Sequence, residues 1–176
     1  MIQVKDKKFE ISIPSEILQE KVKNIAEVLN KDYAGKEPIL IGILNGSFMF
    51  AADLVRHLTF PHEIQFAKFS SYSGMETTVK VKQLIGLTAD IKGRDVIIVE
   101  DIVDTGITMS NLVPQFKEKG AKSIEICTLL MKPEKLQVSL NVKYCAIEIE
   151  NLFVLGYGLD YDGFGRNYKD LYVVCE

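Results

Sequence analysis

Two adjacent acidic residues, Glu100 and Asp101, follow an apolar run and precede a short loop, Asp104 to Thr108. The apolar run, Val96 to Val99, is β-branched throughout and predicts a buried strand. Carboxylates accept hydrogen bonds from hydroxyl groups, whereas the N–H groups of a turn and threonine hydroxyls donate to phosphate oxygens. The sequence therefore predicts a cradle for a ligand with sugar hydroxyls at one end and a phosphate at the other.

This loop also has a purely structural interpretation, because Asp104 or Thr108 could cap the helix that follows. It is not a Walker A loop, which needs Gly-Lys-Ser/Thr, nor a dinucleotide-binding loop, which needs three spaced glycines. Gly106 does permit close approach of the backbone to a ligand, and a helix N-terminus favours a phosphate. The pair Glu100 and Asp101 favours a site, since two like charges after a buried strand repel unless a cation or hydroxyl groups compensate them.

Strands and helices are predicted to alternate around this loop. Apolar and alternating runs predict strands at 39–43, 64–70, 79–85, 96–99, 123–131 and 144–149, and amphipathic patterns predict helices at 15–31, 48–58 and 108–119. The alternation favours an α/β fold with a parallel sheet and helices on both faces. Ligands of such sheets bind at the carboxyl ends of the strands, where Asn45, the loop at 100–108 and Lys132 all fall. We expect these three loops to converge.

Length and composition indicate a single globular domain. With 176 residues, 47% of them hydrophobic, we expect one domain with a core at about 36–150 and a small hood lobe from about 1–15 and 151–176. A net charge of −3 offers no basic surface for nucleic acid. No apolar stretch approaches the roughly 18 residues of a membrane span. We therefore expect a cytoplasmic protein that binds neither nucleic acid nor a membrane.

The run at 96–108 is similar to the phosphoribosyl-pyrophosphate signature of the purine phosphoribosyltransferases, and most similar to the hypoxanthine-guanine phosphoribosyltransferase family. Further segments resemble this family in the same order, between about residues 10 and 166, namely 44–50, 71–72, 127–132 and 153–161. The signature alone is shared with other transferases and with regulators, whereas the segments at Lys132 and 153–160 are specific to 6-oxopurine enzymes. The resemblance implies the type I phosphoribosyltransferase fold. It also implies transfer of 5-phosphoribosyl from its 1-pyrophosphate to hypoxanthine or guanine, which yields IMP or GMP and pyrophosphate.

The resemblance further implies the roles of the residues around the ribose phosphate. Glu100 and Asp101 would hold the ribose hydroxyls, directly or through Mg²⁺, and Asp104 would be the general base near the purine N7. Mg²⁺ is implied because the leaving group is a polyphosphate, and Asp160 would be the carboxylate ligand on the far side. The 5′-phosphate would be bound by the loop residues Asp104, Thr105, Gly106, Ile107 and Thr108.

At the purine, the resemblance implies that Lys132 donates to the 6-oxo group, which selects against adenine. Phe153 would stack on the ring, the Val154 backbone would meet its edge, and Asp160 would complete this end of the site. Without the resemblance, Lys132 would be an ordinary charged residue at a strand end, and Phe153 and Val154 would be core residues.

The remaining implied contacts are to pyrophosphate. Asn45 and Gly46 resemble the pyrophosphate loop, which in the family contains a non-proline cis peptide, although many members carry Lys or Arg at Asn45. Arg166 resembles the pyrophosphate arginine, although Gly165 stands where an aromatic residue is usual. The polar segment 71–77, which begins with Ser71 and Tyr72, resembles the family's lid, and its alternative is a simple surface hairpin.

Two alternatives to this function stay open. A phosphoribosyl-pyrophosphate-sensing regulator could use the same cradle while binding RNA or DNA, but the charge of −3 and the short chain argue against it. Within the enzyme class, a preference for xanthine would depend on contacts near the purine C2 position. The resemblance also suggests a homodimer or homotetramer.

Overall fold

A computed structural model of the chain describes residues 1–72 and 80–175. In this part of the chain, a central sheet has the strand order β5-β4-β3-β6-β7-β8. Strands β4, β3, β6, β7 and β8 are parallel, and β5 is an antiparallel edge strand. The predicted α/β fold with a parallel sheet is therefore confirmed. The strands are β3 (Ile39–Leu44), β4 (Glu63–Tyr72), β5 (Lys80–Ile85), β6 (Asp95–Val103), β7 (Ser123–Met131) and β8 (Tyr144–Glu148).

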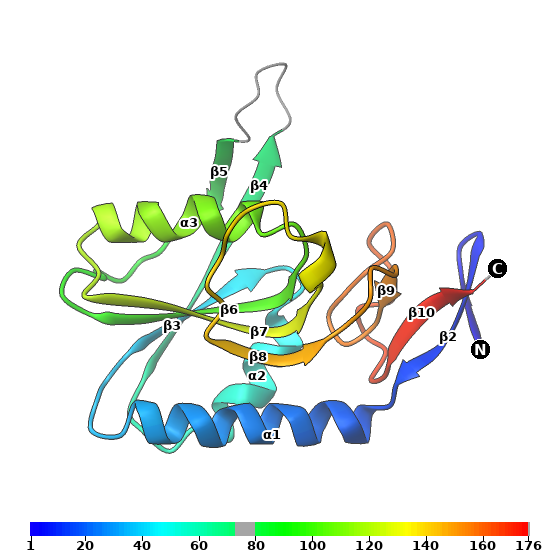
Figure 1. Ribbon diagram of the computed structural model, residues 1–176, viewed down its shortest axis with the longest axis horizontal. Helices are drawn as coiled ribbons and strands as arrows, with labels where there is room; N and C mark the ends of the chain where they lie inside the picture. The colour runs from blue at the N-terminus through cyan, green and yellow to red at the C-terminus, as the bar shows by residue number, and fades with distance from the viewer. Residues whose placement is uncertain (73–79, 176) are drawn as a thin grey trace.

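Helices cover both faces of this sheet, as predicted. Helices α1 (Ser15–Asp32) and α2 (Phe48–Val55) lie on one face, and α3 (Ile107–Glu118) lies on the other (Figure 1). In β6, Ile97 and Val99 pack in the cluster that includes α1 and α2, whereas Val96 and Ile98 pack in the cluster that includes α3. Because neighbouring strand residues point to opposite faces, this strand needs an unbroken apolar run.

The terminal segments form a second, antiparallel sheet in the order β1-β2-β10-β9, which is the predicted hood (Figure 1). Its strands are β1 (Ile2–Val4), β2 (Lys7–Ile13), β9 (Val154–Leu155) and β10 (Leu171–Cys175). Both chain ends lie in this hood, because β10 pairs with β2. None of the helices in the described ranges is long and apolar enough to cross a membrane.

Three predicted boundaries were wrong. Helix α2 ends at Val55 rather than at residue 58, and β4 continues to Tyr72, so Ser71 and Tyr72 are strand residues. Strand β6 continues through the acidic pair to Val103, because Glu100 pairs with Thr128 of β7 and the ladder resumes beyond it. The acidic side chains therefore project from a strand rather than from a loop.

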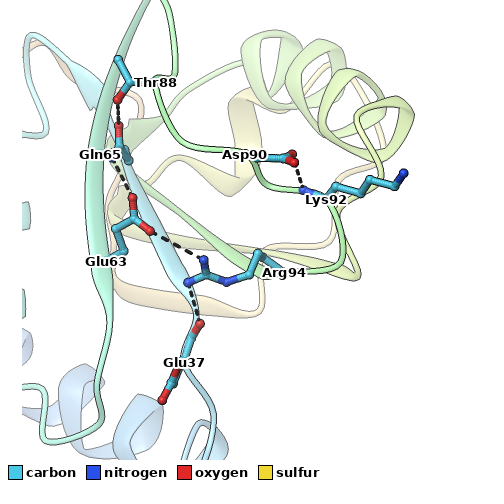
Figure 2. A network of polar contacts seen from close by, with 7 residues as sticks. All are labelled: Glu37, Glu63, Gln65, Thr88, Asp90, Lys92 and Arg94. Carbon is cyan, nitrogen blue, oxygen red and sulfur yellow. Dashed lines mark hydrogen bonds and ion pairs between the residues drawn. The ribbon is translucent and has the colours of Figure 1, made fainter.

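A polar network joins the amino ends of the strands, at the sheet edge opposite the predicted site (Figure 2). The Arg94 guanidinium donates to the Glu37 carbonyl oxygen at 3.0 Å and pairs with the Glu63 carboxylate at 3.6 Å. Gln65 donates to the other Glu63 oxygen at 2.9 Å and accepts from Thr88 at 2.8 Å. These contacts fix the start of β6 against β3 and β4.

Asp95, the first residue of β6, should contribute stability only while it is ionised. It accepts from the Ser123 hydroxyl at 2.6 Å and pairs with Lys122 at 3.2 Å, and chiefly the Ser123 bond lowers the pKa of Asp95. This contribution is therefore present above the unfolded-state pKa of about 3.9 and is lost as the pH falls through the lower folded value. We expect Asp95→Asn to lower the free energy of unfolding by about 1 kcal/mol at neutral pH. Urea denaturation should show that the substitution lowers the free energy of unfolding less near pH 3 than at neutral pH. An equal decrease at both pH values would contradict this role.

Candidate active site

The loop between β6 and α3 lines a cavity of about 220 Å³ on the carboxyl side of the sheet. Helix α3 begins at Ile107, and its N-cap is Gly106, with φ of 79°. Within the described residues neither Asp104 nor Thr108 caps the helix, which removes the structural interpretation of the loop. The Ile107 N–H at the start of α3 donates to the Thr105 hydroxyl at 3.4 Å, and the Gly106 N-cap supplies no side-chain acceptor to the N–H groups that follow, which suits a phosphate site. Among the predicted loop residues, the cavity is lined by Asp104, Thr105, Gly106 and Thr108.

The acidic pair lies beside this loop. Glu100 lines the same cavity but is only 7% exposed, and the Asp101 backbone N–H donates to its carboxylate at 3.1 Å. Burial, together with the neighbouring Asp101 charge, raises the pKa of Glu100 well above its ordinary value. A cation or ribose hydroxyls at this point would offset the cost of ionising Glu100.

The predicted metal ligands are not gathered into one cluster. Among the described residues, no group of three His, Cys, Asp or Glu side chains is placed to hold a metal ion. Glu100 lines the cavity next to α3, whereas Asp160 lines a second cavity next to the hood. The protein thus offers separate carboxylates, which suits an ion that arrives with a polyphosphate.

The second cavity, of about 390 Å³, is the predicted purine end. It lies between the carboxyl end of the sheet and the hood loop, and Asp104 lines both cavities. Asp104 is therefore at the junction between the cavity beside α3 and the second cavity. The predicted purine residues that line this cavity are Lys132, Phe153, Val154 and Asp160.

Lys132 is 6% exposed, and its Nζ lies 3.8 Å from Asp104 Oδ1. Burial is the main cause that lowers the pKa of Lys132. A second lysine, Lys135, was missed by the sequence analysis, and its Nζ lies 2.8 Å from Asp104 Oδ2. A 3₁₀ helix at Pro133–Lys135 brings Lys135 back beside Lys132, because residues three apart eclipse one another in such a helix. The proline that starts this turn was the available signal.

The loop after β3 lies against Asp101. The peptide bond between Leu44 and Asn45 is cis, as expected. Asn45 is exposed, whereas Gly46 is buried, and a Cβ at Gly46 would overlap Asp101 Oδ2. On its other side, the Gly46 carbonyl oxygen is so close to Gly158 that a Cβ there would overlap it. The loop is thus held between β6 and the hood.

Arg166 lies in the hood loop and pairs with Asp160, with 2.7 Å between Nη2 and Oδ1. Its other guanidinium nitrogen donates to the Gly158 carbonyl oxygen at 2.7 Å. Gly165, the departure from the family pattern, has φ of 94° and packs against Leu155, so a side chain there would not fit. The predicted pyrophosphate arginine therefore lies beside Gly158, which itself meets Gly46.

The predicted lid lies largely outside the described residues. Ser71 and Tyr72 end β4, whose antiparallel pairing with β5 extends the sheet beyond α3 (Figure 1). The segment 73–77 that completes the predicted lid belongs to the part of the chain that the structure does not describe.

Comparisons with known proteins agree with this geometry. Residues 14–162 match the family described as the phosphoribosyl transferase domain. The hypoxanthine-guanine phosphoribosyltransferase of Streptococcus pneumoniae R6 is 47% identical over 157 residues, which are 88% of this chain and 84% of that protein. The hypoxanthine phosphoribosyltransferase of Salmonella typhimurium is 43% identical over 155 residues, which are 86% and 87% of the two chains.

A crystal structure supports the same relationship. The hypoxanthine-guanine phosphoribosyltransferase of Bacillus anthracis, solved with a HEPES molecule in the active site, superposes with a TM-score of 0.91 at 41% identity. The match covers 97% of this chain and 100% of that one. The chain therefore belongs to the phosphoribosyltransferase family, among the hypoxanthine and hypoxanthine-guanine phosphoribosyltransferases.

Proposed function

We propose that the protein is a purine salvage enzyme that transfers 5-phosphoribosyl from phosphoribosyl pyrophosphate to hypoxanthine or guanine. The observation that carries this proposal is the position of Asp104 at the junction of the two cavities. One cavity holds the phosphate loop and a buried carboxylate, and the other holds Lys132 and Phe153. The bond that forms, between sugar and purine, would therefore lie beside Asp104.

The pair Lys132 and Asp104 supports a 6-oxopurine as the acceptor. A 6-oxopurine carries an oxo acceptor and an N7–H donor at neighbouring positions of one edge. The Lys132 ammonium can donate to the first, while the Asp104 carboxylate, 3.8 Å away, accepts from the second. Adenine would turn an amino donor toward the ammonium, which would leave both donors unpaired. Phe153, 41% exposed on the hood, supplies a ring face for stacking, and the Val154 backbone would meet the purine edge.

The mechanism follows from these positions. As pyrophosphate leaves the anomeric carbon, the ribose gains positive charge, which the Glu100 and Asp101 carboxylates stabilise while they hold its hydroxyls. Asp104 then accepts the N7 proton as the purine attacks. The 5′-phosphate would be held by the N–H groups at the start of α3 and by Thr105 and Thr108, with Gly106 and Ile107 completing the loop. Asn45, Gly46 and Arg166 would hold the pyrophosphate, so Arg166 would exchange its Asp160 partner for the ligand.

The carboxylates also suit Mg²⁺. All three predicted ligands are carboxylates, the hard oxygen donors that Mg²⁺ prefers, and Glu100 is a buried acid beside a like charge. Glu100 and Asp101 would hold the ion on the ribose side, and Asp160 on the purine side. Bound Mg²⁺ would neutralise charge on the departing polyphosphate. We further propose a cytoplasmic homodimer or homotetramer, and a lid that includes Ser71 and Tyr72, in line with the family resemblance.

Product formation tests this function directly. The protein is incubated with phosphoribosyl pyrophosphate, Mg²⁺ and, in separate reactions, hypoxanthine, guanine, xanthine or adenine. We expect nucleoside monophosphate and pyrophosphate from hypoxanthine and guanine, little from adenine, and no turnover when EDTA removes the metal. The xanthine reaction shows whether the contacts near the purine C2 position also accept xanthine. Absence of pyrophosphate release with every base would refute the enzyme assignment.

Lys132→Met should weaken binding of the base selectively. A hydrogen bond to a charged group contributes about 1.5–3 kcal/mol, so the KM for hypoxanthine should rise roughly 10- to 150-fold with little change for the donor. Because burial lowers the pKa of Lys132, the ammonium should lose its proton below the ordinary lysine value of about 10.4. The KM of the unmodified enzyme should therefore rise as the pH increases into that range.

Two comparisons make the Lys132 test specific. The free purine also ionises at alkaline pH, which by itself raises the KM for hypoxanthine. Lys132→Met is the reference, because its KM should show only this rise and not the additional one caused by deprotonation of Lys132. Lys122→Met removes a lysine that pairs with Asp95 at the opposite sheet edge and should change neither constant. If Lys132→Met binds hypoxanthine as well as the unmodified enzyme, Lys132 does not contact the 6-oxo group.

A further inference from the structure

Lys135 lies closer to the predicted general base, Asp104, than Lys132 does, and no role has yet been assigned to it. Building on the function proposed above, we infer that Lys135 is a positioning residue for Asp104. It binds one carboxylate oxygen of Asp104 and leaves the other directed at the purine N–H. It also keeps Lys132 free for the 6-oxo group.

The two oxygens of Asp104 differ in their contacts. Oδ2 accepts from Lys135 Nζ at 2.8 Å. Oδ1 is buried and, among the described residues, has no hydrogen-bond partner, since Lys132 Nζ stays 3.8 Å away. A buried acceptor without a partner is costly, and a ligand donor would satisfy it. Asp104 lines the purine cavity, so the N7–H of a bound base is the donor that fits.

Backbone contacts hold Lys135 in place without help from its side chain. The Lys135 N–H donates to the Lys132 carbonyl oxygen at 3.1 Å, and the Gln137 N–H donates to the Thr105 carbonyl oxygen at 3.0 Å. Leu136 and Val138 lie against Gly106 in the phosphate loop. The loop after β7 is thus fastened to the loop after β6, and the partly exposed Lys135 side chain can be replaced without removing these contacts.

A fixed partner on Oδ2 has two consequences for catalysis. The last torsion of an aspartate side chain is broad, so a general base needs an external contact to direct one oxygen at the proton. Without Lys135, the cation that the described residues still place near Asp104 is Lys132, which would swing toward the carboxylate and lose its alignment with the 6-oxo group. Both consequences reduce proton transfer, and both leave in place the backbone contact at Thr105 and the packing at Gly106 that hold the rest of the phosphate loop.

Steady-state kinetics of Lys135→Met and Lys135→Arg test this inference, with Lys143→Met as the matched control. Lys143 pairs with Asp32 of α1 at 3.0 Å, away from both cavities. Lys135→Met should lower kcat for hypoxanthine about tenfold, which is smaller than the whole rate contribution of a general base, and should leave the KM for phosphoribosyl pyrophosphate unchanged. Lys135→Arg, which keeps a charged donor, should recover most of this loss, and Lys143→Met should show none.

The acidity of the acceptor provides a second readout. With 8-azahypoxanthine, whose ring N–H is more acidic, the base has less work to do, so the loss in Lys135→Met should shrink to about threefold or less. An unchanged kcat in Lys135→Met would overturn the role of Lys135. So would a loss of kcat that is equal for hypoxanthine and 8-azahypoxanthine and is not recovered in Lys135→Arg. Such a result would leave the proposed function standing, whereas an inactive unmodified enzyme would refute the function itself.

Discussion

Asp104→Asn should lower kcat about 10²- to 10⁴-fold while the KM for phosphoribosyl pyrophosphate stays nearly unchanged. The amide has the shape of the carboxylate but cannot take up a proton, so the loss falls on the transition state rather than on donor binding. The position of Asp104 at the junction of the two cavities is the reason to expect such a selective loss. Initial rates at saturating hypoxanthine, with donor concentration varied, measure both quantities.

Two further variants sharpen this test. Asp95→Asn makes the same substitution at the other end of β6 and should leave kcat unchanged. Adding Lys135→Met to Asp104→Asn should cause almost no further loss, because a positioning residue has no effect once the base is gone. Equal losses in kcat and donor affinity would instead make Asp104 a phosphate-binding residue.

Much of the central sheet could be predicted from local patterns. The run Val96 to Val99 is apolar at every position because both faces of β6 are covered, and this is a strong strand signal. The extension of β6 through Glu100 was missed, since charged residues end the apolar pattern while the ladder to Thr128 of β7 continues. The strand therefore depends on pairing between distant segments at the point where local signals stop.

The hood was foreseen as a lobe but not as strands. Its sheet joins β2 to β10 across almost the whole chain, and β9 is only two residues long. Such short strands gain their stability from partners that are remote in sequence. Their local pattern therefore carries little information about them.

The site residues came from the resemblance, and their spatial relations came from the fold. A cap was a reasonable interpretation of Asp104 until α3 proved to begin at Ile107, with Gly106 as its N-cap. Lys135 could not be paired with Asp104 from the sequence, since the two meet only through one turn of 3₁₀ helix and the contact of neighbouring loops. Local sequence patterns predict individual helices and strands, whereas contacts between loops can be identified only once the sheet is assembled.

Gly46→Ala should reduce kcat/KM for phosphoribosyl pyrophosphate at least about 100-fold, the scale expected when a reacting group is displaced by about 1 Å. The new Cβ would overlap Asp101 Oδ2, so either the acid or the loop must move. The loop has no room to retreat, because the Gly46 carbonyl oxygen is already against Gly158. Displacing Asp101 would disturb the ribose and metal contacts, and displacing the loop would disturb the pyrophosphate contacts.

Gly93→Ala is the matched control for this prediction. Gly93 lies at the amino edge of the sheet, where a Cβ would meet no atom within 4 Å, although its φ of 70° makes alanine strained. The free energy of unfolding should therefore fall by about 1–3 kcal/mol in both variants, but only Gly46→Ala should lose donor binding. Thermal unfolding separates stability from function, and isothermal titration with the Mg²⁺ complex of phosphoribosyl pyrophosphate measures the affinity. If folded Gly46→Ala bound the donor normally, Asn45 and Gly46 would not form the pyrophosphate loop, because the overlap with Asp101 leaves no arrangement in which both contacts persist.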